Sequence, residues 1–225
     1  MRPLARPLFV EALGTFLLVF VVIAATMANN YPLVSFNMLG IALAYGLAYG
    51  LATTIAVPFS DGHINPAVTL GFLSVGRIGP KKALWYIAAQ IIGGVLATLA
   101  VKVTYPGGVT KVTDLGVPTI HSAISFWGAV GIEAILTFFL MTAIYATVVS
   151  PKATKMGGLG VGMTVFAMVL AYGPLTGAVM NPARAFGPSL VTMQWTGHLA
   201  YWIGPVLGAV VAAMVWEKFL MKGEK

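Results

Sequence analysis

The sequence predicts an all-α membrane protein with six transmembrane helices and two re-entrant half-helices, arranged as an inverted 3+3 repeat. Of its 225 residues, 59% are hydrophobic and 8% are charged, a composition more apolar than that of a soluble domain. The tripeptide Asn-Pro-Ala occurs twice, at 65–67 and 181–183, in equivalent places of the two halves. We therefore expect a single domain over 1–225, with repeats at about 1–113 and 114–225.

Apolar runs long enough to cross a bilayer, about 20 residues each, recur along the whole chain. The first run contains Glu11, which argues against a cleaved secretory signal, because the apolar core of such a signal should hold no carboxylate. The six expected spans lie at 8–28, 36–58, 82–101, 125–149, 156–173 and 196–218.

The basic residues predict the orientation of these spans, because lysine and arginine gather on the cytoplasmic side of a membrane. With both termini cytoplasmic, ten of the 13 basic residues fall on that side, against Lys102 and Lys111 on the other. Topology therefore explains the net charge of +7, and no nucleic-acid partner is needed. We expect a multi-pass protein of the cell membrane whose cytoplasmic side carries Arg2, Arg6, Arg77, Lys81, Lys82, Lys152, Lys155, Lys218, Lys222 and Lys225.

The two halves of the chain repeat each other. The sequence EALGTFLLVF at 11–20 is echoed by EAILTFFLM at 133–141, which pairs Glu11 with Glu133. Each half holds an odd number of spans, so the second copy must run upside down relative to the first. Inverted repeats of this kind place binding sites at the membrane midplane, where the halves meet.

Each Asn-Pro-Ala motif lies between full spans and is followed by about eight mostly apolar residues, too few to cross a bilayer. Asparagine is a favoured N-cap and proline suits the first helical position. Asn65 and Asn181 therefore each predict the start of a half-helix. A single Asn-Pro pair would more often open a surface turn, but two equivalent copies favour half-helices that enter the membrane from opposite faces.

The meeting point of the two half-helices should reject cations, because each helix N-terminus carries about half a positive charge. The side-chain amides of Asn65 and Asn181 add donors that suit a neutral molecule with an acceptor oxygen. Arg184 follows Asn181 by three residues, about one turn along the same helix face. Its five hydrogen-bond donors would line the path of a solute, closer to the extracellular end of that path.

Glu11 and Glu133 are carboxylates inside spans, and two roles are open for them. Intramembrane acids often carry protons, so a proton relay is one possibility. The other is that each accepts hydrogen bonds from backbone N–H groups that the half-helices leave unpaired. One glutamate per half, matched to one half-helix per half, favours the second role.

These residues resemble those of the aquaporin, or major intrinsic protein, family over essentially the whole chain. The resemblance implies six tilted helices with two half-helices, one pore per subunit and a homotetramer. It also implies that Glu11 and Glu133 support the pore loops. The family's pore signature then corresponds to Asn65, Pro66, Ala67, Asn181, Pro182 and Ala183.

Counting from the two motifs, the resemblance places the narrowest point of the pore, the selectivity filter, at Tyr45, Val169, Ala178 and Arg184. Strict water channels of the family typically carry Phe and His at the first two places, so Val169 removes a bulky polar wall. Glycerol-type members typically carry Trp, Gly and Phe, a trio that this chain lacks. His63 lines the cytoplasmic half of the pore in many members, and a packed loop histidine is the alternative.

The leading interpretation is a passive channel in which water crosses in single file while ions and protons are rejected. The alternative is a broader channel for small neutral solutes such as glycerol, ammonia or hydrogen peroxide. Ala185 and Ser189 stand where glycerol-type relatives carry Asp and Lys, which favours water, whereas GPLTG at 173–177 is closer to the glycerol branch.

Three other classes are less favoured. A secondary transporter also uses broken helices at the midplane, but the interiors of the spans hold no acids besides the two glutamates. A mainly structural, adhesive membrane protein would show no permeability. An enzyme would need a catalytic constellation that the sequence lacks, and no cofactor or metal is expected, since cysteine is absent and no cluster has metal-ligand spacing.

Overall fold

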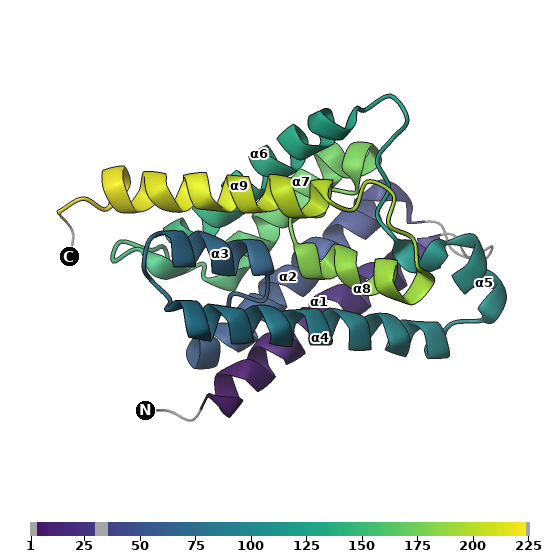
Figure 1. Ribbon diagram of the computed structural model, residues 1–225, viewed down its shortest axis with the longest axis horizontal. Helices are drawn as coiled ribbons and strands as arrows, with labels where there is room; N and C mark the ends of the chain where they lie inside the picture. Colours follow the sequence, from purple (N-terminus) through teal and green to yellow (C-terminus); the bar gives the residue numbers. More distant parts are fainter. Residues whose placement is uncertain (1–3, 30–35, 224–225) are drawn as a thin grey trace.

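The computed structural model describes residues 4–29 and 36–223, which form a helical bundle (Figure 1). Arg2 and Lys225 lie outside these residues. Within them, six helices are long and apolar enough to cross a membrane, which confirms the all-α fold and the six expected spans. They are α1 (Ala5–Asn29), α2 (Asn37–Ser60), α4 (Pro80–Thr104), α6 (Phe126–Ile144, extended by the π-helical turn η2, Tyr145–Val149), α7 (Gly158–Thr176) and α9 (Ala200–Val215, extended by the π-helical turn η3, Trp216–Leu220).

The edges of the spans differ from the expected ones by a few residues, most at the start of the sixth. That helix begins at Ala200 rather than at 196. The preceding residues form a turn instead, in which the N–H of His198 donates to the carbonyl of Trp195.

Two short helices begin at the Asn-Pro pairs: α3 (Pro66–Ser74) and α8 (Pro182–Thr192). With 9 and 11 residues, they are about 14 and 16 Å long, roughly half the thickness of a bilayer core. A short helix α5 (Gly107–Val112) and a 3-10 turn η1 (Asp114–Gly116) follow α4. Neither was predicted, because this connection carries no strong periodic pattern.

The two halves pack in the same way and then exchange their half-helices. In the first half α1 packs on α2 and α4, and in the second half α6 packs on α7 and α9. The half-helix α3 packs mainly on α9, and α8 mainly on α4. Figure 1 shows α3 and α8 between the long helices α4 and α9, with α3 nearer the end where α1 begins and α9 ends. Each half therefore completes the core of the other.

The central contact between the halves is the pair α2 and α7, which glycines allow to approach closely. A methyl group placed on Gly46 would lie 2.6 Å from the carbonyl oxygen of Gly162, and one on Gly50 would lie 2.9 Å from that of Gly158. Glycine is therefore required at these contacts on both helices. Small residues often allow such close packing in membranes, where the hydrophobic effect does not drive helices together.

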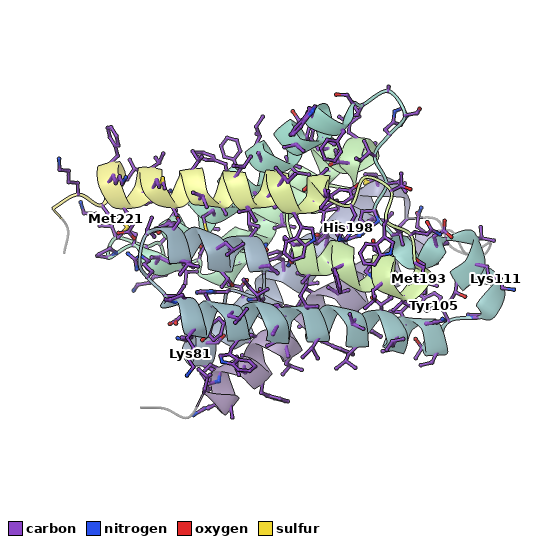
Figure 2. All side chains as sticks on the ribbon, viewed as in Figure 1. Lys81, Tyr105, Lys111, Met193, His198 and Met221 are labelled. Atoms are coloured by element: carbon purple, nitrogen blue, oxygen red, sulfur yellow. The ribbon has the colours of Figure 1, made fainter. Side chains whose placement is uncertain are left out.

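Lys81 and Lys111 lie at opposite ends of the long axis of the bundle (Figure 2). Figure 2 shows Lys81 and Met221 at the end where α1 begins and α9 ends, and Lys111, Met193 and Tyr105 at the opposite end. Lys81 belongs to the set expected on the cytoplasmic side and Lys111 to the smaller set expected outside. We refer to these ends as inner and outer.

Candidate functional site

The two half-helices start in the same way. The side-chain oxygen of Asn65 accepts a hydrogen bond from the N–H of Ala67 at 2.8 Å, and that of Asn181 accepts one from Ala183 at 3.0 Å. The proline after each asparagine occupies the first helical position, where no backbone donor is needed. Each motif is thus a helix cap followed by a helix start, as its sequence predicts.

The asparagine side chains also join the two half-helices to each other. Nδ2 of Asn65 donates to the carbonyl of Met180 at 2.8 Å, and Nδ2 of Asn181 donates to the carbonyl of Ile64 at 3.0 Å. Each acceptor directly precedes the other asparagine. The two positive helix N-termini therefore meet at one buried locus, where a cation is electrostatically disfavoured.

Ile64 and Met180 adopt a backbone conformation that side chains rarely take, with φ of +44° and +54°. For a β-branched residue such as Ile64 this is a marked outlier, and such strain costs on the order of 1–3 kcal/mol. The surrounding hydrogen bonds hold it in place, because the N–H and the carbonyl of both residues are paired.

Glu11 holds the first pore loop from inside α1. Its Oε1 accepts hydrogen bonds from the hydroxyl of Ser60 at 2.6 Å and the N–H of His63 at 3.0 Å. Its Oε2 accepts from the N–H of Ile64 and from Nε2 of Gln90, both at 2.6 Å. The carboxylate therefore satisfies backbone donors that would otherwise be buried without partners.

Glu133 holds the second pore loop in the same way from α6. Its Oε1 accepts from the hydroxyl of Thr176 at 2.7 Å and the N–H of Val179 at 2.9 Å, and its Oε2 accepts from the N–H of Met180 at 2.7 Å. Glu133 is fully buried. Both oxygens of both glutamates are engaged with the loops, which is the arrangement required by the loop-supporting alternative.

A cavity of 240 Å³ opens at the outer end and brings together three of the four residues expected in the filter, Tyr45, Val169 and Arg184. Ala178 is fully buried and does not line this cavity. Nη1 of Arg184 donates to the carbonyl of Gly116 at 3.0 Å. The guanidinium group is thus anchored to η1 while its side chain lines the cavity.

A second cavity, of 300 Å³, opens at the inner end and is lined by Asp61, His63 and Arg77 among others. His63 is 4% exposed, and its Nδ1 lies 3.1 Å from the hydroxyl of Thr69. The imidazole also packs against the rings of Phe72 and Tyr86. His63 is therefore packed within the loop and also borders the inner cavity.

Helix α2 relates the two cavities to the asparagine pair. Tyr45 borders the outer cavity and Val57 the inner one, about 18 Å apart along the helix axis. Between them, the hydroxyl of Tyr49 accepts a hydrogen bond from Nδ2 of Asn65 at 3.1 Å. The asparagine pair therefore lies between the two cavities.

Sequence reasoning missed three contributors to this site. Tyr49 and Gln90 each carry a polar group within an apolar span, a signal that could have singled them out. Gln90 bridges Glu11 and Thr69. Gly116 contributes only a backbone carbonyl from η1, and nothing in its sequence context marks it.

A membrane-spanning bundle with two half-helices that meet at its centre, and a cavity at either end of that meeting point, defines a channel protein. Comparison with known proteins identifies the family of this channel. The sequence profile of the family described as Major intrinsic protein matches residues 2–216. The chain is 40% identical to Aquaporin TIP4-4 of Zea mays over 96% of its own length and 87% of that protein, and 44% identical to Probable aquaporin TIP3-1 of Oryza sativa subsp. japonica over 80% and 68%.

Among solved structures, the fold is similar to that in the X-ray structure of the aquaglyceroporin from Plasmodium falciparum. The TM-score is 0.82 at 25% sequence identity, and 98% of each chain is covered. The chain therefore belongs to the major intrinsic protein family, as its motifs indicated. It is a channel of the membrane and not an enzyme.

Proposed function

We propose that this chain is a passive water channel in which water crosses in single file between the two cavities. The observation that carries the proposal is the junction of the half-helices, where two positive helix ends and two asparagine side chains converge. A neutral molecule with an acceptor oxygen is stabilised there, whereas a cation meets a barrier.

In this proposal the starts of the two half-helices lie at the centre of the path, where Asn65 and Asn181 cap them. These starts consist of Asn65, Pro66, Ala67, Asn181, Pro182 and Ala183. Arg184, Tyr45, Val169 and Ala178 form the filter at the outer end. Glu11 and Glu133 support the loops, and His63 borders the inner end. Arg184 adds a positive charge that opposes cations.

Osmotic shrinkage of proteoliposomes, followed by stopped-flow light scattering against an impermeant osmolyte, tests the proposal. We expect water efflux well above that of protein-free liposomes of the same lipid and size. Efflux no faster than in those liposomes would refute the proposal.

A broader channel for small neutral solutes is the second candidate, supported by the small apolar side chains of Val169 and Ala178. Such a filter has a less polar wall than that of the strict water channels. The same vesicles challenged with a glycerol gradient distinguish the two candidates. Fast re-swelling after the initial shrinkage would favour the broader channel.

The family resemblance also supports a homotetramer. Light scattering combined with size-exclusion chromatography in detergent should then give a protein mass of four chains. The excess of basic residues at the inner end supports cytoplasmic termini. We propose the cell membrane as the compartment of the protein. Fluorescent tags on either terminus, with membrane fractionation, test both the orientation and the compartment.

A further inference from the structure

We infer that Glu217 is a positioning residue of the inner cavity, which holds the guanidinium group of Arg77 against the cavity wall and so keeps the path open for water. The inference rests on the proposed channel function and adds a residue outside the asparagine pair and the outer filter. Arg77 borders the inner cavity. Its Nε donates to Oε1 of Glu217, which belongs to η3 at the end of α9.

The backbone of Arg77 is fixed by the end of the half-helix α3. Gly76, with φ of +76°, follows the cap of this helix, and its N–H donates to the carbonyl of Leu73 at 3.1 Å. The N–H of Arg77 donates to the carbonyl of Phe72 at 3.0 Å. These two bonds form the glycine-based helix ending known as the Schellman motif. The motif brings Arg77 to the inner cavity but leaves the direction of its long side chain to the partners of the guanidinium group.

Glu217 and Tyr145 give that side chain one direction. Oε1 of Glu217 accepts from Nε of Arg77 and also from the hydroxyl of Tyr145 at 3.1 Å. The guanidinium carbon lies 5.5 Å from the centre of the Tyr145 ring, a distance at which a cation is attracted to an aromatic face. The Tyr145 ring in turn stacks on that of Trp216, with ring centres 5.5 Å apart. These contacts bind the guanidinium group to the inner ends of α6 and α9.

Without Glu217, the cation would have a competing partner at the same cavity. Asp61 also borders the inner cavity. Its carboxylate pairs with Lys82 at 3.5 Å, an exposed contact of a kind that contributes little to stability. A guanidinium group released from Glu217 would be attracted to this carboxylate and would then lie in the cavity of 300 Å³, where it obstructs water.

The exposure of the two carboxylates explains why Arg77 pairs with Glu217 in the intact protein. The side chain of Glu217 is 14% exposed, whereas that of Asp61 is 75% exposed. Attraction between charges is screened less where they are partly buried. Glu217 therefore binds the guanidinium group more strongly than Asp61 can, and the path stays open.

Water efflux from proteoliposomes tests the role of Glu217 through two substitutions and their combination. Glu217→Gln keeps the size of the side chain and an acceptor for Tyr145, but it loses the charge that binds Arg77. We expect efflux to fall about twofold or more, the effect of a side chain that occupies the path for at least half of the time. Arg77→Ala removes the obstructing group, so its efflux should equal or exceed that of the wild type.

The double variant Arg77→Ala/Glu217→Gln distinguishes positioning from a structural role. If Glu217 acts by positioning Arg77, the double variant regains the efflux of Arg77→Ala. If the ion pair serves only to hold the end of α9 in place, efflux in the double variant stays as low as in Glu217→Gln. That second result would overturn the inference, as would wild-type efflux in Glu217→Gln or reduced efflux in Arg77→Ala.

Lys218→Gln is the matched control, because it changes the charge of the adjacent, exposed residue of η3. It should conduct like the wild type, and a loss equal to that of Glu217→Gln would also contradict the inference. If Glu217→Gln does not elute as folded protein, Glu217→Met takes its place, since methionine has a similar length and no charge. The same fall in efflux and the same recovery with Arg77→Ala are then expected.

The wild-type measurement separates this inference from the proposed function. A wild-type chain that conducts no water contradicts the channel proposal, and this inference with it. A wild-type chain that conducts water, with equal efflux in Glu217→Gln, contradicts only the role of Glu217.

Discussion

Asn65 and Asn181 each donate a side-chain hydrogen bond to the carbonyl of the residue that precedes the other, at 2.8 and 3.0 Å. The same side chains cap their own half-helices. One amide therefore performs two tasks, with its oxygen serving its own helix and its nitrogen serving the opposite loop. The positions of the two helix starts are linked by this exchange.

The substitution Asn181→Ala removes a helix cap and the link to Ile64 together. We expect a loss of about 1 kcal/mol from the cap alone and a marked fall in water permeability, because the loop of the first half loses its anchor. Thermal unfolding in detergent and stopped-flow efflux measure the two effects. The control is Ser125→Ala, which removes the cap of α6 and should leave water efflux at the wild-type value.

The substitution Glu133→Gln replaces a carboxylate oxygen with an amino group next to backbone donors. A buried N–H without an acceptor costs about 1–3 kcal/mol, so the melting temperature should fall clearly. The exposed change Asp114→Asn applies the same chemistry at the surface and should have little effect. Equal melting temperatures for the wild type and Glu133→Gln would contradict the loop-supporting role.

The substitution Arg184→Ala removes the permanent charge from the outer cavity. We expect faster glycerol re-swelling and a measurable proton leak, because the cavity becomes wider and the barrier to cations lower. A pH-sensitive dye trapped in the vesicles reports the leak. Lys111→Ala, which removes an exposed outer charge away from the cavity, should behave like the wild type. A proton-tight Arg184→Ala channel would show that the helix ends alone exclude cations.

The chain has no cysteine, so mercurial reagents that act on thiols should not inhibit water efflux. The variant Ala178→Cys places a thiol beside the proposed filter and should become sensitive. Thr154→Cys, in the exposed connection before α7, should bind the reagent without loss of efflux. Inhibition of the wild-type protein would mean that these reagents act through a different group.

We expect His198 to make the free energy of unfolding depend on pH. Its Nε2 accepts a hydrogen bond from Nε1 of Trp202 at 3.1 Å, and burial lowers the pKa of His198. The unfolded chain therefore takes up a proton first as the pH falls through about 6.5, and stability decreases from there towards the lower folded pKa. Melting temperatures should fall between about pH 7 and pH 5. His198→Gln should show a weaker dependence, and an identical slope in both proteins would exclude this role.

The sequence alone predicts the spans, the half-helices and their caps, because these features follow from local patterns. The apolar runs recur at the length of a bilayer crossing, and the two equivalent Asn-Pro pairs suit the start of a helix. Glu11, Glu133 and Arg184 can also be singled out from the sequence, because each is a charged residue in an apolar segment. A buried charge needs a partner.

The finer contacts of the site depend on tertiary structure. The link from Arg184 to Gly116 uses a backbone carbonyl, a group that every residue in the chain carries. The pairing of Tyr45 with Val179 and of Tyr49 with Asn65 requires the register of α2 against both loops. Local pattern does not encode that register.

The exchange between the asparagines also implies an order of assembly. Glu11 and Ile64 are 53 residues apart, and Glu133 and Met180 are 47 apart, so each half can close its own loop soon after synthesis. Asn65 and Met180 are 115 residues apart, and closing such a distant contact comes late. During translation, Asn65 can already bond to Tyr49 and Ala67 within the first half, but its bond to Met180 must wait until the second half arrives. The conducting path would then be the last part of the molecule to form.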